Sequence, residues 1–438
     1  MKKIIGAALL GTMAAGVFAA DAKINLNFRH RLDAFSQVKV DSDDEEEKGT
    51  VRNWMNQNGY NGPSADDFSF QLDGENAGAK VIWEIDNENM RLSAKQYFGY
   101  MRFNAGPGVL TLEAGRWNNG YADDAYRVNA DARNLEGLDF ERFKLGTIFA
   151  VYDEKGEKDK TSNDIKGLTF VDDLNFGGNV SGFASYKFNV NNDIFLNLTV
   201  GGVQKDNFDT YKDGDTTTNW KSALASRIQF GMKNLLNAEF IYKKWAPRYN
   251  TFALYLMPQV MDALTLNVGG AVETFSGNRS NEKYTDWAVD LRLRYQVMDP
   301  LSVTFFTNIS GTNVDKGRAI AAGIVGNDDD QTEYGNAWIM NDTDFKFKTV
   351  MWNQLGARYV VNDALTATFN VGLISLLKKG DGNNSPYGPE WRVVPGVEVF
   401  ADKNASIWAA VALSGAMADD DKGSVFAVNI PVIFRVKM

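Results

Sequence analysis

Few side chains in this sequence could carry out covalent chemistry. There is one histidine, His30, and no cysteine, so a thiol nucleophile and a multi-ligand thiol or histidine metal site are both absent. Paired carboxylates occur, as at Glu45 and Glu46 and at 328–330, but only within exposed acidic runs. General acid–base catalysis needs two carboxyl groups in different environments, which a solvated run does not supply. We therefore predict that the protein is not an enzyme and holds no metal or cofactor.

Charged side chains do recur in a pattern that could sort solutes by charge. Within 286–297, every second residue is apolar or aromatic: Trp287, Val289, Leu291, Leu293, Tyr295 and Val297. The residues between them are mostly charged or polar: Asp286, Ala288, Asp290, Arg292, Arg294 and Gln296. A β-strand places alternate residues on opposite faces, so the segment is predicted to be a strand with one apolar and one charged face. Fixed charges that line water in a low-dielectric wall select solutes by charge.

The same alternation recurs along the chain, and the connections between the strands alternate in length. Three of them, at 260–265, 297–302 and 361–366, are near copies that read as short Asx turns. The connections between these hairpins are long and polar, as at 312–346 and 378–390. Short periplasmic turns and long extracellular loops are typical of outer-membrane barrels. A soluble β-sandwich is the alternative, but it does not predict this strict alternation.

These observations predict an all-β fold, a transmembrane antiparallel up-and-down β-barrel. Our best count is about 20 strands, within a range of about 16–20, because such barrels have an even number of strands. The count includes a hairpin at 137–152 and a strand at 405–415, which are the weakest segments. By parity, the inward residues include the following charged side chains: Arg227, Arg292, Arg294, Arg358, Arg392, Asp33, Glu84, Glu239, Glu273, Asp290 and Glu398.

The N-terminus is predicted to be a secretory signal peptide. Lys2 and Lys3 precede an apolar run at 4–18, and small residues suited to cleavage follow. The run is shorter than the roughly 20 residues that a membrane-spanning helix needs. We therefore expect residues 1–20 to be removed, with cleavage somewhere in 19–22, and residues 21–438 to form a single barrel domain.

The overall charge and hydropathy limit the partners. The formal net charge is −10, and an acidic protein is a poor ligand for nucleic acid. The mean hydropathy is only −0.31, which a barrel tolerates because only alternate strand residues must be apolar. The expected partners are outer-membrane lipid, lipopolysaccharide and small hydrophilic solutes. The oligomeric state stays open, with a homotrimer among the options.

The segment 90–134 resembles the bacterial general porins. In that family, a strand of the type aromatic-Phe-Val-Gly-Leu, a Gly-containing turn and a strand Thr-Val-Thr-Leu-Gly-Arg precede the loop that folds into the pore. The matching residues here are 97–101 (Tyr-Phe-Gly-Tyr-Met) and 110–116 (Leu-Thr-Leu-Glu-Ala-Gly-Arg), with Glu113 or Ala114 as an extra residue. The resemblance implies that 118–134 is the loop that bends into the lumen.

The resemblance also implies a constriction in which loop acids face a basic wall. The acids would be Asp123, Asp124 and Asp131, and the candidates for the facing wall are Arg29, Arg31 and Lys95. The last strand, 424–438, is similar to the family's assembly signal, with apolar residues at alternate positions up to Met438 in place of the usual Phe. The outer-membrane assembly machinery is therefore a further expected partner.

Together, these features predict an outer-membrane porin that passes small hydrophilic solutes and ions by passive diffusion. Two alternatives stay open. A substrate-specific channel of the sugar type would need a row of lumen aromatics, and the candidates are scattered along the sequence: Tyr97, Phe183, Phe195 and Phe306. A structural or adhesive barrel would instead have a blocked lumen.

Overall fold

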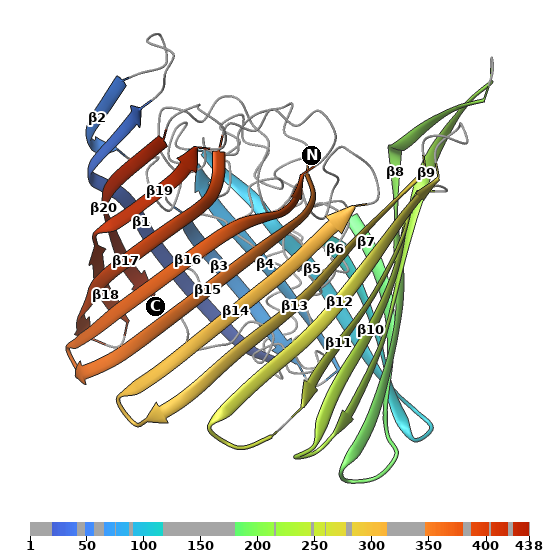
Figure 1. Cartoon of the computed structure of the whole chain (residues 1–438). Coiled ribbons are helices and arrows are strands. Elements are labelled where there is room, and N and C mark those ends of the chain that lie inside the picture. The colour runs from blue at the N-terminus through green and yellow to red at the C-terminus, as the bar shows by residue number, and fades with distance from the viewer. Residues whose placement is uncertain are drawn as a thin grey trace.

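The fold of the chain is seen in a computed structural model (Figure 1). The structure describes residues 20–41, 49–56, 65–74, 76–86, 91–116, 180–213, 216–246, 249–258, 260–276, 283–312, 347–379, 387–402, 404–418 and 424–437. All named elements in these ranges are β-strands. In the same ranges, no helix is long and apolar enough to cross a membrane. The predicted signal peptide, but for Ala20, and the hairpin predicted at 137–152 lie outside the described residues.

Twenty strands are named, and paired strands are antiparallel throughout the described sheet. The first ten are β1 (Ala20–Asp41), β2 (Gly49–Asn56), β3 (Ala65–Gly74), β4 (Ala77–Asp86), β5 (Arg91–Ala105), β6 (Gly108–Arg116), β7 (Val180–Asn189), β8 (Ile194–Asp213), β9 (Thr216–Met232) and β10 (Leu236–Ala246). The others are β11 (Tyr249–Pro258), β12 (Leu264–Ser276), β13 (Lys283–Met298), β14 (Leu301–Thr312), β15 (Phe347–Asn362), β16 (Leu365–Lys379), β17 (Tyr387–Asp402), β18 (Ala405–Ala410), β19 (Ala412–Ala418) and β20 (Ser424–Lys437).

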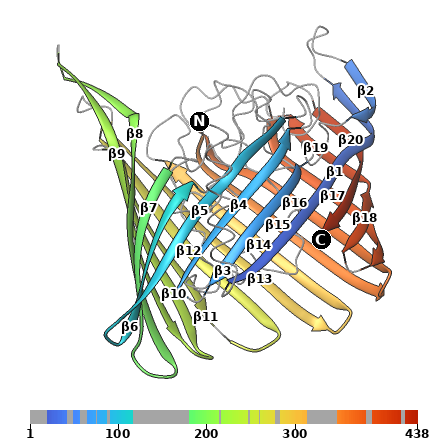
Figure 2. The same cartoon turned by 180° about the vertical axis from the view of Figure 1, so that it is seen from behind.

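The sheet closes into a barrel because its first and last strands pair. One edge of β1 is paired with β20 from Asn27 to Asp41, and the other edge is paired with β3 and then β2. β3 and β2 thus lie end to end along β1. β18 and β19 likewise lie end to end between β17 and β20, on either side of Val411. The twenty described strands therefore occupy eighteen positions around the barrel. Figures 1 and 2 show the barrel from opposite sides.

The eighteen positions fall within the predicted range of 16–20 strands but below the best count of 20, and the members differ. The sequence alternation does not predict β2, and it treats β18 and β19 as one strand. β6 pairs with β7 over the whole length of β6, from Gly108 to Arg116. The ring of paired strands therefore closes without the hairpin predicted at 137–152.

Short turns join the strands at one end of the barrel, as the Asx pattern predicts. Asn191 Oδ1 accepts a hydrogen bond from the backbone N–H of Asp193 at 2.8 Å, and Asn362 Oδ1 accepts one from Ala364 N–H at 2.9 Å. The side chain of Asp402 makes the same contact with the backbone two residues on. These bonds satisfy turn backbone groups without help from a partner strand. The long connections attach at the opposite end of the barrel.

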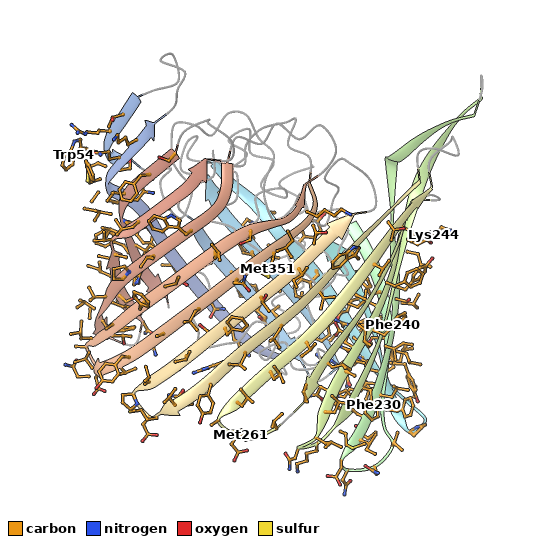
Figure 3. The ribbon with its side chains drawn as sticks, viewed as in Figure 1. Trp54, Phe230, Phe240, Lys244, Met261 and Met351 are labelled. Carbon is orange, nitrogen blue, oxygen red and sulfur yellow. The ribbon has the colours of Figure 1, made fainter. Side chains whose placement is uncertain are left out.

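The outer face of the wall is apolar and the inner face is largely polar. Leu198 and Ile228 are 42% and 45% exposed, whereas their chain neighbours Asn197 and Arg227 are 0% and 1% exposed. Phe240 is the register partner of Ile228, and Figure 3 shows it projecting from the outside of the barrel. This polarity is the inverse of a soluble protein and suits a barrel whose outside contacts lipid.

Aromatic side chains border the outer face at both ends. Near the loop end, the indole rings of Trp287 and Trp391 lie over glycines of the neighbouring strands. A side chain added at either glycine would collide with the indole ring. The ring centroids of Phe35 and Trp54 are 4.7 Å apart at the same end. A second set lies near the turn end: Phe103, Tyr186, Tyr295, Tyr359 and Phe434. Two such belts mark the two membrane–water interfaces.

Candidate functional site: the inner wall of the barrel

The inner face is the candidate site because only its side chains can contact a solute inside the barrel. On β7–β10 it carries six polar or charged side chains that are at most 4% exposed, here called the polar arc: Ser185, Asn197, Thr199, Arg227, Gln229 and Glu239. On β17–β20 it carries six apolar side chains that are at most 6% exposed, here called the apolar arc: Val394, Trp408, Ala410, Ala412, Ala427 and Ile433. Three polar side chains on these strands are buried to the same extent: Glu398, Ser414 and Asn429. The two arcs lie on opposite sides of the barrel (Figure 1).

The polar arc is a continuous chain of side-chain hydrogen bonds across four strands. Ser185 Oγ donates to Asn197 Oδ1 at 2.8 Å, and Asn197 Nδ2 donates to Gln229 Oε1 at 2.9 Å. Gln229 Nε2 then donates to Glu239 Oε2 at 2.7 Å. The register places these residues on the same face of β7, β8, β9 and β10, one strand spacing apart. Lateral partners within the wall therefore replace the water that these groups lose on burial.

The donors of this chain all point towards one carboxylate. Ser185 Oγ is also 2.8 Å from Thr199 Oγ1. Because a serine hydroxyl has one proton and Ser185 gives it to Asn197, Thr199 is the donor in that contact. The amide dipoles of Asn197 and Gln229 follow in the same direction and end on Glu239. Aligned hydrogen bonds of this kind polarise one another, so each bond strengthens the next along the chain.

A buried ion pair completes the polar arc. Arg227 Nη1 lies 3.7 Å from Glu239 Oε2, and both side chains are fully buried. Arg227 is one of the two largest fully buried side chains in the described part of the chain. Two charges removed from water need mutual attraction and further hydrogen bonds to offset the loss of hydration. Glu239 receives both, from Arg227 and from Gln229.

A third part of the inner wall combines aromatic rings with charges. Tyr100 on β5, Glu113 on β6 and Phe183 on β7 are successive register partners, and each is at most 8% exposed. The guanidinium of Arg102 lies 4.2 Å from the centroid of the Tyr100 ring. On the next strands, Lys187 and Phe195 make a similar contact, with Nζ 4.7 Å from the ring centroid. Cations at these distances are attracted by the ring quadrupole.

A β-bulge at Lys95 decides which aromatic residues of β5 face inward. The pairing between β4 and β5 skips Lys95, and an extra residue of this kind reverses the alternation along the strand. Beyond the bulge, Tyr97 is 39% exposed on the outer face, and Phe98 is 8% exposed on the inner face. The prediction that Tyr97 is a lumen aromatic is therefore wrong. Phe98 and Tyr100 are the inward aromatics of this strand.

The predicted constriction residues are only partly described. Asp123, Asp124 and Asp131 lie outside the described residues. Arg29 and Arg31 lie in β1, where they pair with residues of β20, and Lys95 is the bulged residue of β5. β3 and β4 separate β1 from β5 in the circuit. A constriction between these six residues stays a prediction.

Three of the other charges predicted to face inward are buried on the inner face. Arg227, Glu239 and Glu398 are confirmed as inner-face side chains, each at most 1% exposed, beside outer neighbours such as Ile228 and Phe240. The inward position of Glu113 and the hydrogen-bond chain of the polar arc were not predicted from the sequence. No linear spacing signals that chain, because it joins residues from four strands through the register between them. Among the described residues, no group of three or more His, Cys, Asp or Glu side chains could hold a metal ion.

A closed antiparallel barrel with an apolar, aromatic-bordered outer face and a polar, charged inner face is a transmembrane β-barrel of the bacterial outer membrane. No protein-family model matches the chain, and no curated protein matches it.

Solved structures share its general outline. OccK11 (OpdR) of Pseudomonas aeruginosa is 10% identical with a TM-score of 0.49, and 95% of this chain and 96% of that chain are covered. OccK2 (OpdF) of the same organism, solved in complex with glucuronate, is 11% identical with a TM-score of 0.49, over 95% and 98% of the two chains. The outer membrane protein OpdK of that organism is 11% identical with a TM-score of 0.47, over 95% and 99%. At such values the likeness defines neither a family nor a solute for this chain.

Proposed function

We propose that this outer-membrane barrel is a porin, a channel through which small hydrophilic solutes and ions diffuse passively. The observation that carries the proposal is the inverted polarity of the wall. Besides the buried polar arc, the inner face has partly exposed cations such as Lys80, Arg294 and Arg358. Charges there attract ions into a narrow aqueous path and discriminate between them.

Single-channel recording in a planar lipid bilayer tests this proposal. The purified barrel should insert with discrete conductance steps that scale with salt concentration. The folded state is checked by its heat-modifiable mobility on a gel, and the heat-denatured sample serves as the control. A pure, folded barrel that gave no conductance would contradict the porin and favour a structural or adhesive barrel.

Residues 118–134 are proposed to narrow this channel. Deletion of 122–132 should raise the conductance and weaken the discrimination between solutes of different size. Replacing Asp123 and Asp124 by Asn should shift the reversal potential in a salt gradient towards anion preference, because two fixed negative charges leave the path. The control is Glu45→Gln with Glu46→Gln, in an acidic run between β1 and β2, which should leave the reversal potential unchanged.

A substrate-specific channel is the second candidate, and the aromatic cluster of the inner wall favours it. Phe98, Tyr100, Phe183 and Phe195 are inward on β5, β7 and β8, next to charged side chains. Aromatic faces beside charged groups suit solutes that have both an apolar ring face and hydroxyl groups, such as sugars. Liposome swelling with a series of sugars measures this. Tyr100→Ala should change the relative rates, whereas Tyr97→Ala, on the outer face, should not.

A further inference from the structure

Two arginines of the inner wall flank a strip of hydroxyl groups. Arg294 on β13 is the register partner of Thr304 on β14, and Arg358 on β15 is the register partner of Ser302 on that same strand. β14 lies between β13 and β15, as Figure 1 shows. The arginine side chains are partly exposed, whereas the two hydroxyl side chains are at most 7% exposed. A solute in the lumen therefore meets the arginines before the hydroxyls.

The two arginines lie close enough for their positive charges to repel each other. An anion bound between them would replace this repulsion by two attractions. A guanidinium group holds its N–H donors in a rigid planar fork that matches a pair of oxygen atoms. The pair therefore suits oxyanions, such as phosphates and carboxylates, better than cations or neutral solutes.

A buried amide lies in the same row of the wall as Arg294 and Thr304. Asn370 on β16 pairs with Gly356 on β15, which in turn pairs with Thr304. The hydroxyl of Thr304 leans over Gly356, where an added Cβ would lie 2.5 Å from Thr304 Oγ1. Asn370 is 1% exposed, and neither Nδ2 nor Oδ1 has a hydrogen-bond partner in the described part of the chain. Because an unpaired buried amide costs about 1–3 kcal/mol, a bound group that accepts from its N–H donors would stabilise this row.

The acidic side chains that the structure describes on the inner face are withdrawn from the lumen. They are Glu113, Glu239 and Glu398, and each is at most 3% exposed. Glu239, for example, forms its ion pair within the wall. Among the described side chains of the inner face, the cations of β13 and β15 therefore reach the surface of the wall, whereas the acids do not.

We propose that Arg294 and Arg358, with Thr304 and Asn370 beside them, form a binding site for small oxyanions on the lumen wall. The site gives the channel a preference for anions although the formal net charge of the chain is −10. The anion preference rests on the proposed porin function, because it concerns solutes that cross the barrel. Each arginine lies four residues before the end of its strand, at Met298 or Asn362, so the site lies near the turn end. Fixed cations there raise the local concentration of anions.

Line broadening of the phosphorus NMR signal of inorganic phosphate tests binding to the folded full-length barrel in detergent. Arg294→Gln with Arg358→Gln should weaken binding roughly tenfold or more, because charge-assisted hydrogen bonds are lost. The control Lys244→Gln, on the outer face in Figure 3, should leave it unchanged. Equal broadening in the double variant would overturn the proposal.

Competition by a second anion identifies what the site accepts. Relief of the broadening by acetate would show that carboxylates share the site, and no relief would restrict the site to phosphate. Relief by chloride at the same concentration would overturn the assignment to oxyanions, because chloride has no pair of oxygen atoms for the fork.

The reversal potential in a potassium chloride gradient provides the second measurement. The unaltered channel should prefer anions, and the double glutamine variant should shift towards cations. Arg294→Lys with Arg358→Lys should keep the anion preference but bind phosphate more weakly, because lysine keeps the charge and lacks the planar fork. Heat-modifiable mobility confirms that each variant folds.

A cation preference of the unaltered channel would overturn the proposed selectivity. A barrel without conductance would contradict the porin, whereas the NMR measurement would still decide whether the arginines bind oxyanions. The two proposals can therefore fail separately.

Discussion

The polar arc and the apolar arc lie on opposite sides of one wall, and their inward side chains are buried by different kinds of contact. On β7–β10, polar side chains bury each other through lateral hydrogen bonds and one ion pair. On β17–β20, apolar side chains have few such partners and are buried all the same. The comparison indicates that lateral hydrogen bonds satisfy the buried groups of the first arc, whereas close packing within the wall, as of Trp408 and Ala410 against Gly396, buries the second.

The outer faces of the two arcs, in contrast, are alike. Ile228 on the polar side is 45% exposed, and Val397 on the apolar side is 46% exposed. Lipid imposes the same requirement all around the barrel, because it offers no hydrogen bonds anywhere. The inner face has no such uniform solvent, so its composition varies with what each arc contacts. The change in unfolding free energy caused by a substitution should therefore depend on which face and which arc the residue belongs to.

The largest effect is expected from breaking the ion pair of the polar arc. Glu239→Ala leaves Arg227 buried without its carboxylate partner, at a cost of about 3–5 kcal/mol in the free energy of unfolding. Urea unfolding of the barrel in lipid vesicles, followed by tryptophan fluorescence, measures this cost. The double variant Arg227→Met with Glu239→Leu should recover most of it, because an apolar pair has no charge to solvate. If the double variant were as unstable as Glu239→Ala, the buried charge would not be the cause.

A smaller and uniform effect is expected on the outer face. Ile228→Arg and Val397→Arg each place a cation against the hydrocarbon layer, which costs roughly 2–4 kcal/mol near the midplane. The two costs should agree within about 1 kcal/mol, because lipid covers both arcs in the same way. Assembly yield and urea unfolding in vesicles measure them. A cost at only one position would show that the outer faces of the two arcs contact different surroundings.

A still smaller effect is expected at the one described side-chain hydrogen bond of the apolar arc. Trp408→Phe removes the donor to Thr368 and part of the ring, and should lower the unfolding free energy by about 1–2 kcal/mol. Thr368→Val removes the acceptor while keeping the volume. In the double variant the two costs should not add, because both remove the same bond. Full additivity would mean that Trp408 acts through packing alone.

The sequence predicts the barrel well because the information for it is local. Alternation identifies the strands, and the Asx turn at Asn362 forms as its sequence predicts. The inward parity of Arg227, Glu239 and Glu398 is confirmed for the same reason.

The inner wall is less predictable because it depends on register and irregularity. The bulge at Lys95 reverses the faces of Tyr97 and Phe98, and no residue type near Lys95 signals a bulge. The chain from Ser185 to Glu239 exists only because the register aligns four strands. The predicted contact between the acids of 118–134 and the basic wall remains a prediction.

The smallest effect is expected next to the polar arc, at Thr111 on β6. Thr111 and Ser185 are register partners, and both side chains are buried. Ser185 bonds two partners, whereas Thr111 Oγ1 has no hydrogen-bond partner among the described residues. Removal of a hydroxyl that makes no bond is close to neutral, while removal of a bonded one leaves buried partners unsatisfied.

Thr111→Val should therefore change the unfolding free energy by less than about 0.5 kcal/mol, and Ser185→Ala should cost about 1–2 kcal/mol. Both are hydroxyl deletions at register partners of neighbouring strands, so a difference in depth along the barrel does not explain a contrast between them. Paired urea titrations of the two variants in the same vesicles measure it. Equal costs would mean that the lateral hydrogen bonds of the polar arc do not stabilise it.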